Sequence, residues 1–340
     1  MREELFQKFL ENYFGHSDFT ITPLQQSGSA RQNLIIETSD NKYILTFNEK
    51  IDENESFFYL TNAFRNLQLR VPEIYAINAE RNLYLQQYVG SNTLSEVITK
   101  EGHSERIKRL VGKTIKALSN FQQKTSGNID FSNAYEYEAY DSFPITHDLY
   151  YFKNFLVDIL EIDYHKGKIL KEFKHISDKV QSLQPHTVMM RDFQARNIMV
   201  DDQDEIYFID YQAAMLGPAT YDLVSFLFQA KANFSAEWKN EFLSEYLALN
   251  KDSFSEDSFK ETVNYCKFMR FLQVLGAYGF RGLIQRKKHF IESINQGIKN
   301  ISELKEQWEE INDYPELSKV ITELQSVNTQ QKVNQLINGQ

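Results

Sequence analysis

The chain has 340 residues, of which 42% are hydrophobic and 25% are charged, a composition typical of a globular protein with one large or two medium-sized domains. Its net charge of −10 argues against nucleic acid or an anionic membrane as a partner. The single cysteine, Cys266, excludes an intramolecular disulfide and a thiolate metal cluster within this chain, and we expect it to be a buried small side chain.

The opening segment, MREELFQKFLENYFG, is amphipathic and acidic, unlike the charged-then-apolar pattern of a secretion signal. No run of about 18 apolar residues follows anywhere in the chain. We therefore expect neither a signal peptide nor a membrane span, and hence a cytoplasmic protein. Nothing in the sequence indicates an oligomeric state.

The first ninety residues predict a small antiparallel sheet with one helix packed on it. An opening helix is expected over residues 2–14, followed by strand-like runs at Phe19–Pro23, in LIIET and in NKYILTF. The segment DENESFFYLTNAFRNL carries phenylalanine and leucine at three- and four-residue spacing, which predicts an amphipathic helix. VPEIYAI and LYLQQYV, separated by the polar NAERN, predict one more hairpin.

From about Thr93 the pattern is mostly helical, with one hairpin at Ile198–Ile209. The expected helices are Leu94–Lys100, Ser104–Thr125, Ile145–Leu160, Gly167–Leu183, Tyr221–Gln229, Glu237–Leu249, Ser255–Gly279 and Lys287–Glu310. The polar tail from Lys319 predicts one or two weakly docked helices. The fold class is therefore α+β, with a small β-rich lobe followed by a larger, mostly helical one.

Three polar residues stand at fixed intervals around that hairpin: Asp192, Asn197 five places on, and Asp210 thirteen places after that. The apolar runs Ile198–Val200 and Ile206–Ile209 are expected to pair and to bring Asn197 and Asp210 to the same end. Carboxylate and carboxamide oxygens are ligands that Mg²⁺ prefers. Phosphoryl transfer from ATP needs an orienting residue at the acceptor hydroxyl and ligands for the Mg²⁺ that bridges the phosphates. The arrangement resembles the protein-kinase pattern, in which a catalytic Asp is followed by an Asn and, across a hairpin, by a metal-binding Asp. This resemblance implies Asp192 as the catalytic residue and Asn197 and Asp210 as metal ligands.

The stretch IDYQAAMLGPATYDL resembles the metal motif IDxxxxxxGxxxxDL of the aminoglycoside phosphotransferase and choline kinase-like superfamily, with Asp210, Gly217 and Asp222 at the matching positions. The loop RDFQARN is similar to the HGDxHxxN motif of that superfamily, although Gln194 stands where the second His usually lies. The resemblance implies that Asp222 is structural and accepts hydrogen bonds from the backbone of the catalytic loop.

The resemblance extends roughly from Ser27 to Glu310 and implies a protein-kinase-like fold with two lobes. Residues 1–88 would form the nucleotide-binding lobe, and residues 89–340 the catalytic and acceptor-binding lobe. Within the superfamily, YDLVSFL and FMRFLQVLGAYGFRGL look like the branch of anomeric kinases that act on N-acetylmuramate and N-acetylglucosamine.

This likeness implies ATP and Mg²⁺ as cofactors and a small molecule as the acceptor, with the anomeric hydroxyl of an amino sugar as the expected target. A choline, amino-alcohol or aminoglycoside kinase stays open as an alternative. So does a kinase-like protein that binds a nucleotide without catalysis.

The strand NKYILTF lacks the lysine that a kinase-like fold usually offers to the phosphates, because Lys42 lies too early and Lys50 lies beyond the strand. Arg31, in the turn QSGSARQN, is a candidate replacement, since a guanidinium suits phosphate oxygens. The alternative is an exposed surface arginine. Glu55, on the following helix, would then pair with Arg31 or stay solvated.

The same turn is expected to offer backbone N–H groups of Ser27, Gly28 and Ser29 to phosphate. By resemblance, the backbone near Gln87 and Val89 would bind the adenine edge.

The acceptor is expected to lie over the catalytic loop, against the helical lobe. The candidate acceptor-binding residues are Asp148, Arg270, Gln273 and Tyr278, with Gly276 and Gly279 allowing close approach. Carboxylate, guanidinium, amide and phenol groups together suit a ring that bears hydroxyls and an acetamide. The alternative is that Arg270 and Gln273 only form hydrogen bonds within the helical lobe.

Overall fold

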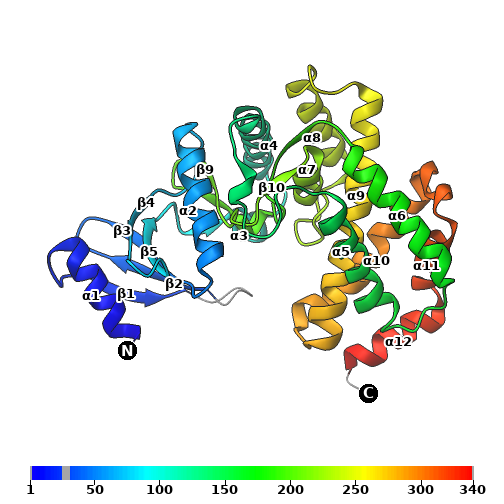
Figure 1. The fold of residues 1–340 in the computed structure, drawn as a ribbon, viewed down its shortest axis with the longest axis horizontal. Coiled ribbons are helices and arrows are strands. Elements are labelled where there is room, and N and C mark those ends of the chain that lie inside the picture. Colours follow the sequence, from blue (N-terminus) through cyan, green and yellow to red (C-terminus); the bar gives the residue numbers. More distant parts are fainter. Residues whose placement is uncertain (1, 25–30, 339–340) are drawn as a thin grey trace. The chain divides into compact units, whose positions relative to one another are not determined.

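The computed structural model describes residues 2–24 and 31–338, and Figure 1 labels their helices and strands. They divide into two units. The first comprises Met1–Thr114, Gln123–Glu138 and Ala195–Ala214, and the second comprises Ile115–Gln122, Ala139–Gln194 and Met215–Gln340. An antiparallel sheet dominates the first unit and helices dominate the second, which confirms the α+β fold class. The lobe boundary predicted after residue 88 stays a prediction.

The main sheet of the first unit has five antiparallel strands in the spatial order β1-β2-β3-β5-β4. The strands are β1 (Thr20–Pro23), β2 (Gln32–Glu37), β3 (Lys42–Phe47), β4 (Ile74–Ile77) and β5 (Leu83–Gln87). Every neighbouring pair of strands runs antiparallel, and the register between β4 and β5 shifts once, between Ile74 and Ala76. The strands predicted from sequence are therefore confirmed.

A helix covers each face of this sheet, because successive strand residues point to opposite sides. Phe6 and Leu10 of α1 (Arg2–Phe14) pack with buried residues of β2, β3 and β5. Tyr84 of β5 points the other way and contacts α2 (Ile51–Asn66), where its ring lies 5.4 Å from that of Phe57 and 5.1 Å from that of Phe58.

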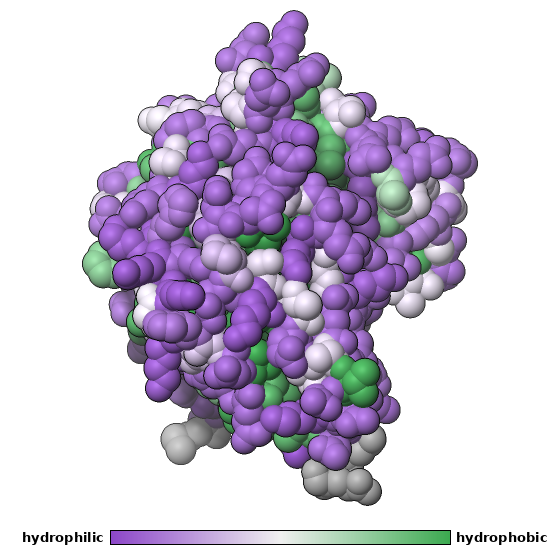
Figure 2. Space-filling model, turned by 90° about the vertical axis from the view of Figure 1, so that its right-hand side faces the viewer, coloured by the Kyte–Doolittle hydropathy of each residue, from purple (hydrophilic) through white to green (hydrophobic). Residues whose placement is uncertain are grey.

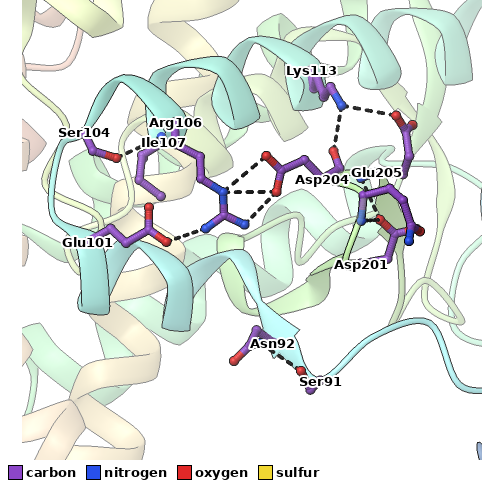
Figure 3. A network of polar contacts seen from close by, with 11 residues as sticks. Ser91, Asn92, Glu101, Ser104, Arg106, Ile107, Lys113, Asp201, Asp204 and Glu205 are labelled. Carbon is purple, nitrogen blue, oxygen red and sulfur yellow. Dashed lines mark hydrogen bonds and ion pairs between the residues drawn. The ribbon is translucent and has the colours of Figure 1, made fainter.

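The rest of the first unit contains a three-stranded sheet in the order β6-β8-β9 and two helices that follow β6. These elements are β6 (Asn92–Thr93), α3 (Leu94–Glu101), α4 (Glu105–Thr125), β8 (Ile198–Val200) and β9 (Ile206–Phe208), together with the short 3₁₀ helices η1 (Phe131–Asn133) and η3 (Ala195–Asn197). The start of α4 holds the β8–β9 turn, as Figure 3 shows: Arg106 donates hydrogen bonds of 2.6–3.2 Å to the Asp204 carboxylate, and Lys113 donates to the Asp204 carbonyl at 2.8 Å. Asn197 and Asp210 flank the opposite, open end of this hairpin.

In the second unit, α9 is the central helix and packs against α5, α7 and α10. The elements are α5 (Ser142–Phe152), η2 (Lys153–Val157), α6 (Lys166–Ser182), β7 (His186–Met189), β10 (Met215–Pro218), α7 (Thr220–Leu227), α8 (Ala236–Leu249), α9 (Glu256–Tyr278), η4 (Gly279–Ile284), α10 (Lys288–Gln307), η5 (Glu309–Asp313), α11 (Pro315–Leu324) and α12 (Val327–Asn338). A Cβ atom at Gly276 would lie 2.7 Å from the Phe152 nitrogen, so this glycine permits helix packing against α5.

Three features differ from the prediction. The helix expected over Ile145–Leu160 ends as an α-helix at Phe152 and continues as the π-helical η2. Strands β7 and β10 pair antiparallel and were not predicted. The first part of the tail is firmly packed, because α11 buries Leu317, Val320, Ile321 and Leu324 completely, whereas α12 buries only Thr329 and Val333 among its described side chains.

In the part of the chain that the structure describes, no helix combines the length and apolar character needed to span a membrane. The molecular face in Figure 2 is mostly hydrophilic, with small separate groups of hydrophobic residues.

Candidate active site

The β8–β9 hairpin brings Asn197 and Asp210 to one end, as the spacing predicted. The strands pair Ile198 with Phe208 and Val200 with Ile206, and the N–H of Ile209 donates to the Asn197 carbonyl at 3.0 Å. Asn197 is buried, whereas the Asp210 side chain is 32% exposed. Asp210 also has a left-handed backbone conformation with φ of 62°, which an aspartate tolerates better than most residues. The hairpin therefore presents one exposed carboxylate beside a buried carboxamide.

Arg31 forms an ion pair with this carboxylate. Its Nη2 pairs with Asp210 Oδ1, and its Nε lies 3.7 Å from Glu53 Oε1 in the first turn of α2. Burial lowers the pKa of the Arg31 guanidinium, but the charge of Asp210 and its other neighbours outweigh burial, so the pKa is raised overall. A permanent positive charge thus lies beside the proposed metal ligand.

Glu55 does not take the role that the sequence suggested. It pairs with Arg81, whose Nη2 donates to Glu55 Oε2 at 2.7 Å, so neither alternative considered for it was right. The carboxylate beside Arg31 is Glu53, two residues earlier. Because residues two apart on a helix do not share a face, only one of the two glutamates can point towards Arg31.

The strand itself offers no substitute for Arg31. Lys42 begins β3, is exposed, and pairs with Glu37 on the neighbouring strand. The apolar side chains of β3 that follow face the two sheet surfaces.

The donors at the hairpin end fit Mg²⁺ in kind, since both are hard oxygen donors. Besides Arg31, the Asp210 carboxylate accepts a hydrogen bond from Gln212 Nε2 at 3.1 Å. Among the described residues there is no cluster of three or more His, Cys, Asp or Glu side chains that could hold a metal. A metal at Asn197 and Asp210 would therefore need further oxygens, which nucleotide phosphates supply.

The predicted nucleotide contacts are described only in part. Ser27, Gly28 and Ser29 lie outside the described residues. The N–H of Gln87 donates to the Glu73 carbonyl at 2.8 Å, so this group is already used within the sheet. Val89 is buried beside Gly90, where a Cβ atom would lie 2.7 Å from the Val200 carbonyl. Glycine at 90 thus lets this segment run close to β8.

Asp192 belongs to the second unit, in the loop that follows β7, and Asp222 of α7 anchors the start of that loop. The Asp222 carboxylate accepts hydrogen bonds from the N–H groups of Met190 at 2.6 Å and Arg191 at 3.2 Å. Burial raises the pKa of Asp222 to about 7, although these two hydrogen bonds act in the opposite direction.

Arg191 and Asp148 form a buried ion pair next to Asp192. Both Arg191 Nη atoms donate to the Asp148 carboxylate at 2.8 Å, and the Tyr140 hydroxyl donates to it at 2.8 Å. Burial raises the pKa of Asp148, but Arg191 and the hydrogen-bond donors outweigh it and lower the pKa overall. The Asp148 side chain is 2% exposed, so it does not line an open surface where an acceptor could reach it. Asp148 contacts the loop through Arg191, whose φ is 73°, and its predicted role in acceptor binding stays a prediction.

The Asp192 carboxylate is 34% exposed and is held by two side chains. Arg270 Nη2 donates to Asp192 Oδ1 at 3.2 Å, and Gln194 Nε2 donates to the same oxygen at 2.5 Å. Arg270 Nη1 in turn donates to Gln273 Oε1 at 2.9 Å. The contacts within the helical unit that were considered as an alternative for Arg270 and Gln273 are therefore present. Arg270 therefore links Gln273 to Asp192, the predicted catalytic residue.

Tyr278 and Cys266, which the sequence analysis also singled out, pack against other side chains of the second unit. Tyr278 is half-buried at the end of α9, with its ring 6.1 Å from that of Phe290. Cys266 is fully buried as expected, and burial raises the pKa of its thiol to about 12. Such a thiol is a poor nucleophile.

The residues that sequence reasoning missed are Glu53, the Arg191–Asp148 pair and the contact of Arg270 with Asp192. One signal was available for Asp148, because a carboxylate within the apolar face of a helix needs a cationic partner.

A comparison with protein-family models matches residues 20–260 to the phosphotransferase enzyme family. No curated protein sequence matches the chain.

Several solved structures share the fold at low sequence identity. The choline kinase LicA from Streptococcus pneumoniae is 15% identical, with a TM-score of 0.59 over 89% of this chain and 99% of that one. A choline/ethanolamine kinase family protein from Mesorhizobium loti is 14% identical, with a TM-score of 0.58 over 95% of this chain and 98% of that one. A spectinomycin phosphotransferase in complex with ADP and spectinomycin is 13% identical, with a TM-score of 0.54 over 88% of this chain and 93% of that one. These likenesses show a kinase-like fold.

Proposed function

The chain belongs to the phosphotransferase enzyme family and is therefore a kinase, and from that premise we propose that it transfers the γ-phosphoryl group of ATP to the anomeric hydroxyl of an N-acetylated amino sugar. Because one fold can serve many substrates, the acceptor has to be argued from the residues of the site. The observation that favours this acceptor is the contact between Arg270 and Asp192.

A permanent cation beside the catalytic carboxylate disfavours a cationic acceptor. Arg270 lies 3.2 Å from Asp192, and burial of Arg270 leaves its charge weakly screened. A quaternary ammonium or a protonated amine placed near Asp192 would meet this charge. The other predicted acidic group, Asp148, is already neutralised by Arg191. The described surroundings of Asp192 therefore suit a neutral or anionic polyhydroxyl ring better than choline or an aminoglycoside.

Arg270 and Gln273 offer groups that suit such a ring. A guanidinium and a side-chain amide can bind hydroxyl and acetamide oxygens, and they already form a connected pair on α9. An N-acetylated sugar presents both kinds of oxygen. N-acetylglucosamine and N-acetylmuramate are the proposed acceptors.

In the proposed reaction, Asp192 accepts the proton of the acceptor hydroxyl, and Arg270 and Gln194 hold its carboxylate in place. The hydroxyl oxygen forms a bond to the γ-phosphorus, the bond from that phosphorus to the β–γ bridging oxygen breaks, and ADP leaves with the electron pair. Asn197 and Asp210 would hold Mg²⁺, which neutralises charge on the phosphates.

Arg31 supplies the positive charge for the phosphates that a lysine of β3 would otherwise provide. In the structure it pairs with Asp210 and lies beside Glu53. When nucleotide and Mg²⁺ bind, the Arg31 guanidinium would exchange the Asp210 carboxylate for phosphate oxygens, which match its planar donors.

A panel of acceptors tests the proposal. Purified protein with ATP and Mg²⁺ is assayed for ADP release with N-acetylglucosamine, N-acetylmuramate, choline and spectinomycin, and with the Asp192→Asn variant as control. We expect sugar-dependent release from the wild type alone. Release with choline or spectinomycin and with neither sugar would overturn the acceptor assignment while leaving the kinase activity in place.

A further inference from the structure

Two lysines of the second unit share one aromatic ring and have no acidic partner. Lys267 of α9 lies with its Nζ 4.4 Å from the centroid of Phe228, and Lys239 of α8 lies 5.3 Å from the same centroid. Within the described ranges, neither ammonium group has a carboxylate within ion-pair distance. Two other lysines that contact a ring face, Lys153 and Lys179, also pair with Asp158 and Glu261.

The surroundings of Lys267 disfavour its positive charge. Burial, together with the charge of Lys239, lowers its pKa to about 8. Burial also lowers the pKa of Lys239, and the charge of Glu303 partly opposes this effect. A cation–π contact stabilises one ammonium by about 0.5–2 kcal/mol, but a second ammonium over the same ring adds repulsion. Burying a cation without a counter-charge is costly, and binding of an anion beside the two ammonium groups would offset that cost.

The pair lies on the same side of α9 as the catalytic contact. Lys267, Arg270 and Phe271 are three and four residues apart, so their side chains share one helix face, about one turn in length. Phe271 contacts Phe228, with ring centroids 6.3 Å apart, and Arg270 reaches Asp192. Phe228 directly follows α7, the helix whose Asp222 holds the loop before Asp192. Helix geometry therefore places Lys267 about one turn from Arg270, the residue that reaches Asp192.

We propose that Lys267 and Lys239, over Phe228, form a binding site for a carboxylate carried by the acceptor. This inference rests on the proposed function and narrows it: the preferred acceptor is an acidic sugar rather than a neutral one. Arg270 would bind ring oxygens near the reacting hydroxyl, while the lysine pair would bind the acid group one helical turn away.

Kinetics with two acceptors that differ by one acidic group provide the first test. N-acetylmuramate carries a lactyl ether carboxylate that N-acetylglucosamine lacks. We expect Lys267→Met to lower kcat/KM for N-acetylmuramate by at least about tenfold, because a charge-assisted contact is lost, and to leave N-acetylglucosamine within about twofold. Lys267→Arg should restore most of the loss. The control is Lys174→Met, which removes the same charge from an exposed lysine of α6.

Equal effects of Lys267→Met on both sugars, or no effect on either, would overturn the proposal. So would a wild-type enzyme that prefers the neutral sugar.

A second test does not depend on the sugar assignment. The rate at which acetic anhydride modifies Lys267, Lys239 and Lys174 at pH 8 is followed by mass spectrometry, with sodium D-lactate or sodium chloride at equal ionic strength. We expect D-lactate alone to protect Lys267 and Lys239, and neither salt to protect Lys174. Absence of protection by D-lactate, or protection by inorganic phosphate but not by D-lactate, would overturn the carboxylate site. If neither sugar is phosphorylated but D-lactate protects, the proposed acceptor fails and the anion site stands.

Discussion

Replacing Asp148 by asparagine tests whether this carboxylate holds the catalytic loop or binds the acceptor. The change removes the charge that accepts two 2.8 Å hydrogen bonds from Arg191, and Arg191 stays buried with its side chain only 18% exposed. Breaking a buried ion pair from one side costs roughly 3–5 kcal/mol. Because asparagine still accepts a hydrogen bond from Tyr140, we expect the lower end, about 3 kcal/mol.

Urea denaturation measures this cost as a lower midpoint with an unchanged slope. The control is Asp178→Asn, which breaks an exposed ion pair with Lys174 on α6 and should cost no more than about 0.5 kcal/mol. Adding Arg191→Met to Asp148→Asn should recover part of the stability, since the unpaired charge is gone. In the enzyme, Asp148→Asn should lower kcat more than it raises the acceptor KM. Wild-type stability together with a raised acceptor KM would refute the reasoning and return Asp148 to the acceptor site.

Four further predictions concern the two halves of the site. Asp210→Asn should remove nearly all transfer while the urea midpoint stays near that of the wild type; normal turnover at limiting Mg²⁺ would show that Asp210 is no metal ligand. Asp192→Asn should lower kcat by about 10²–10⁴-fold with little change in the KM for ATP, and an equal loss of ATP affinity would place Asp192 at the phosphates instead. Arg31→Ala should raise the KM for ATP, and Glu53→Gln should do so more weakly because it only supports Arg31; unchanged ATP kinetics in both variants would leave Arg31 a structural role. The folded-state pKa of Asp222, about 7, lies above the value of about 3.9 in an unfolded chain, so its contribution to stability is full below about pH 4 and is lost as the pH rises to about 7. The urea midpoint of the wild type relative to Asp222→Asn should therefore decrease over that range, and a pH-independent difference would contradict the buried carboxyl.

Much of the fold could be predicted because its elements carry strong periodic patterns. Helices such as α2 and α4 repeat apolar residues every three or four positions, and the hairpin β8–β9 is framed by a polar turn. Strands β7 and β10 could not be found this way, because each has four residues and they pair across a long stretch of intervening chain. A short apolar run without alternation does not distinguish a strand from a loop.

For the site, the spacing of Asp192, Asn197 and Asp210 made them candidates, and their roles stay predictions. The partners of these residues depend on tertiary contacts that spacing does not encode. The rotation of α2 about its axis decides whether Glu53 or Glu55 points towards Arg31, and that rotation is set by packing of its aromatic residues on β5. The partner of Arg191 likewise lies 43 positions earlier in the chain.

The central proposal, transfer of phosphate from ATP to an anomeric hydroxyl, is tested most directly by phosphorus NMR of the product formed from ATP, Mg²⁺ and either N-acetylglucosamine or N-acetylmuramate. We predict one new sugar phosphate whose phosphorus couples to the anomeric proton, formed by the wild type and not by Asp192→Asn. A phosphorus coupled instead to the protons of carbon 6, or no sugar phosphate while choline or spectinomycin is phosphorylated, would contradict it.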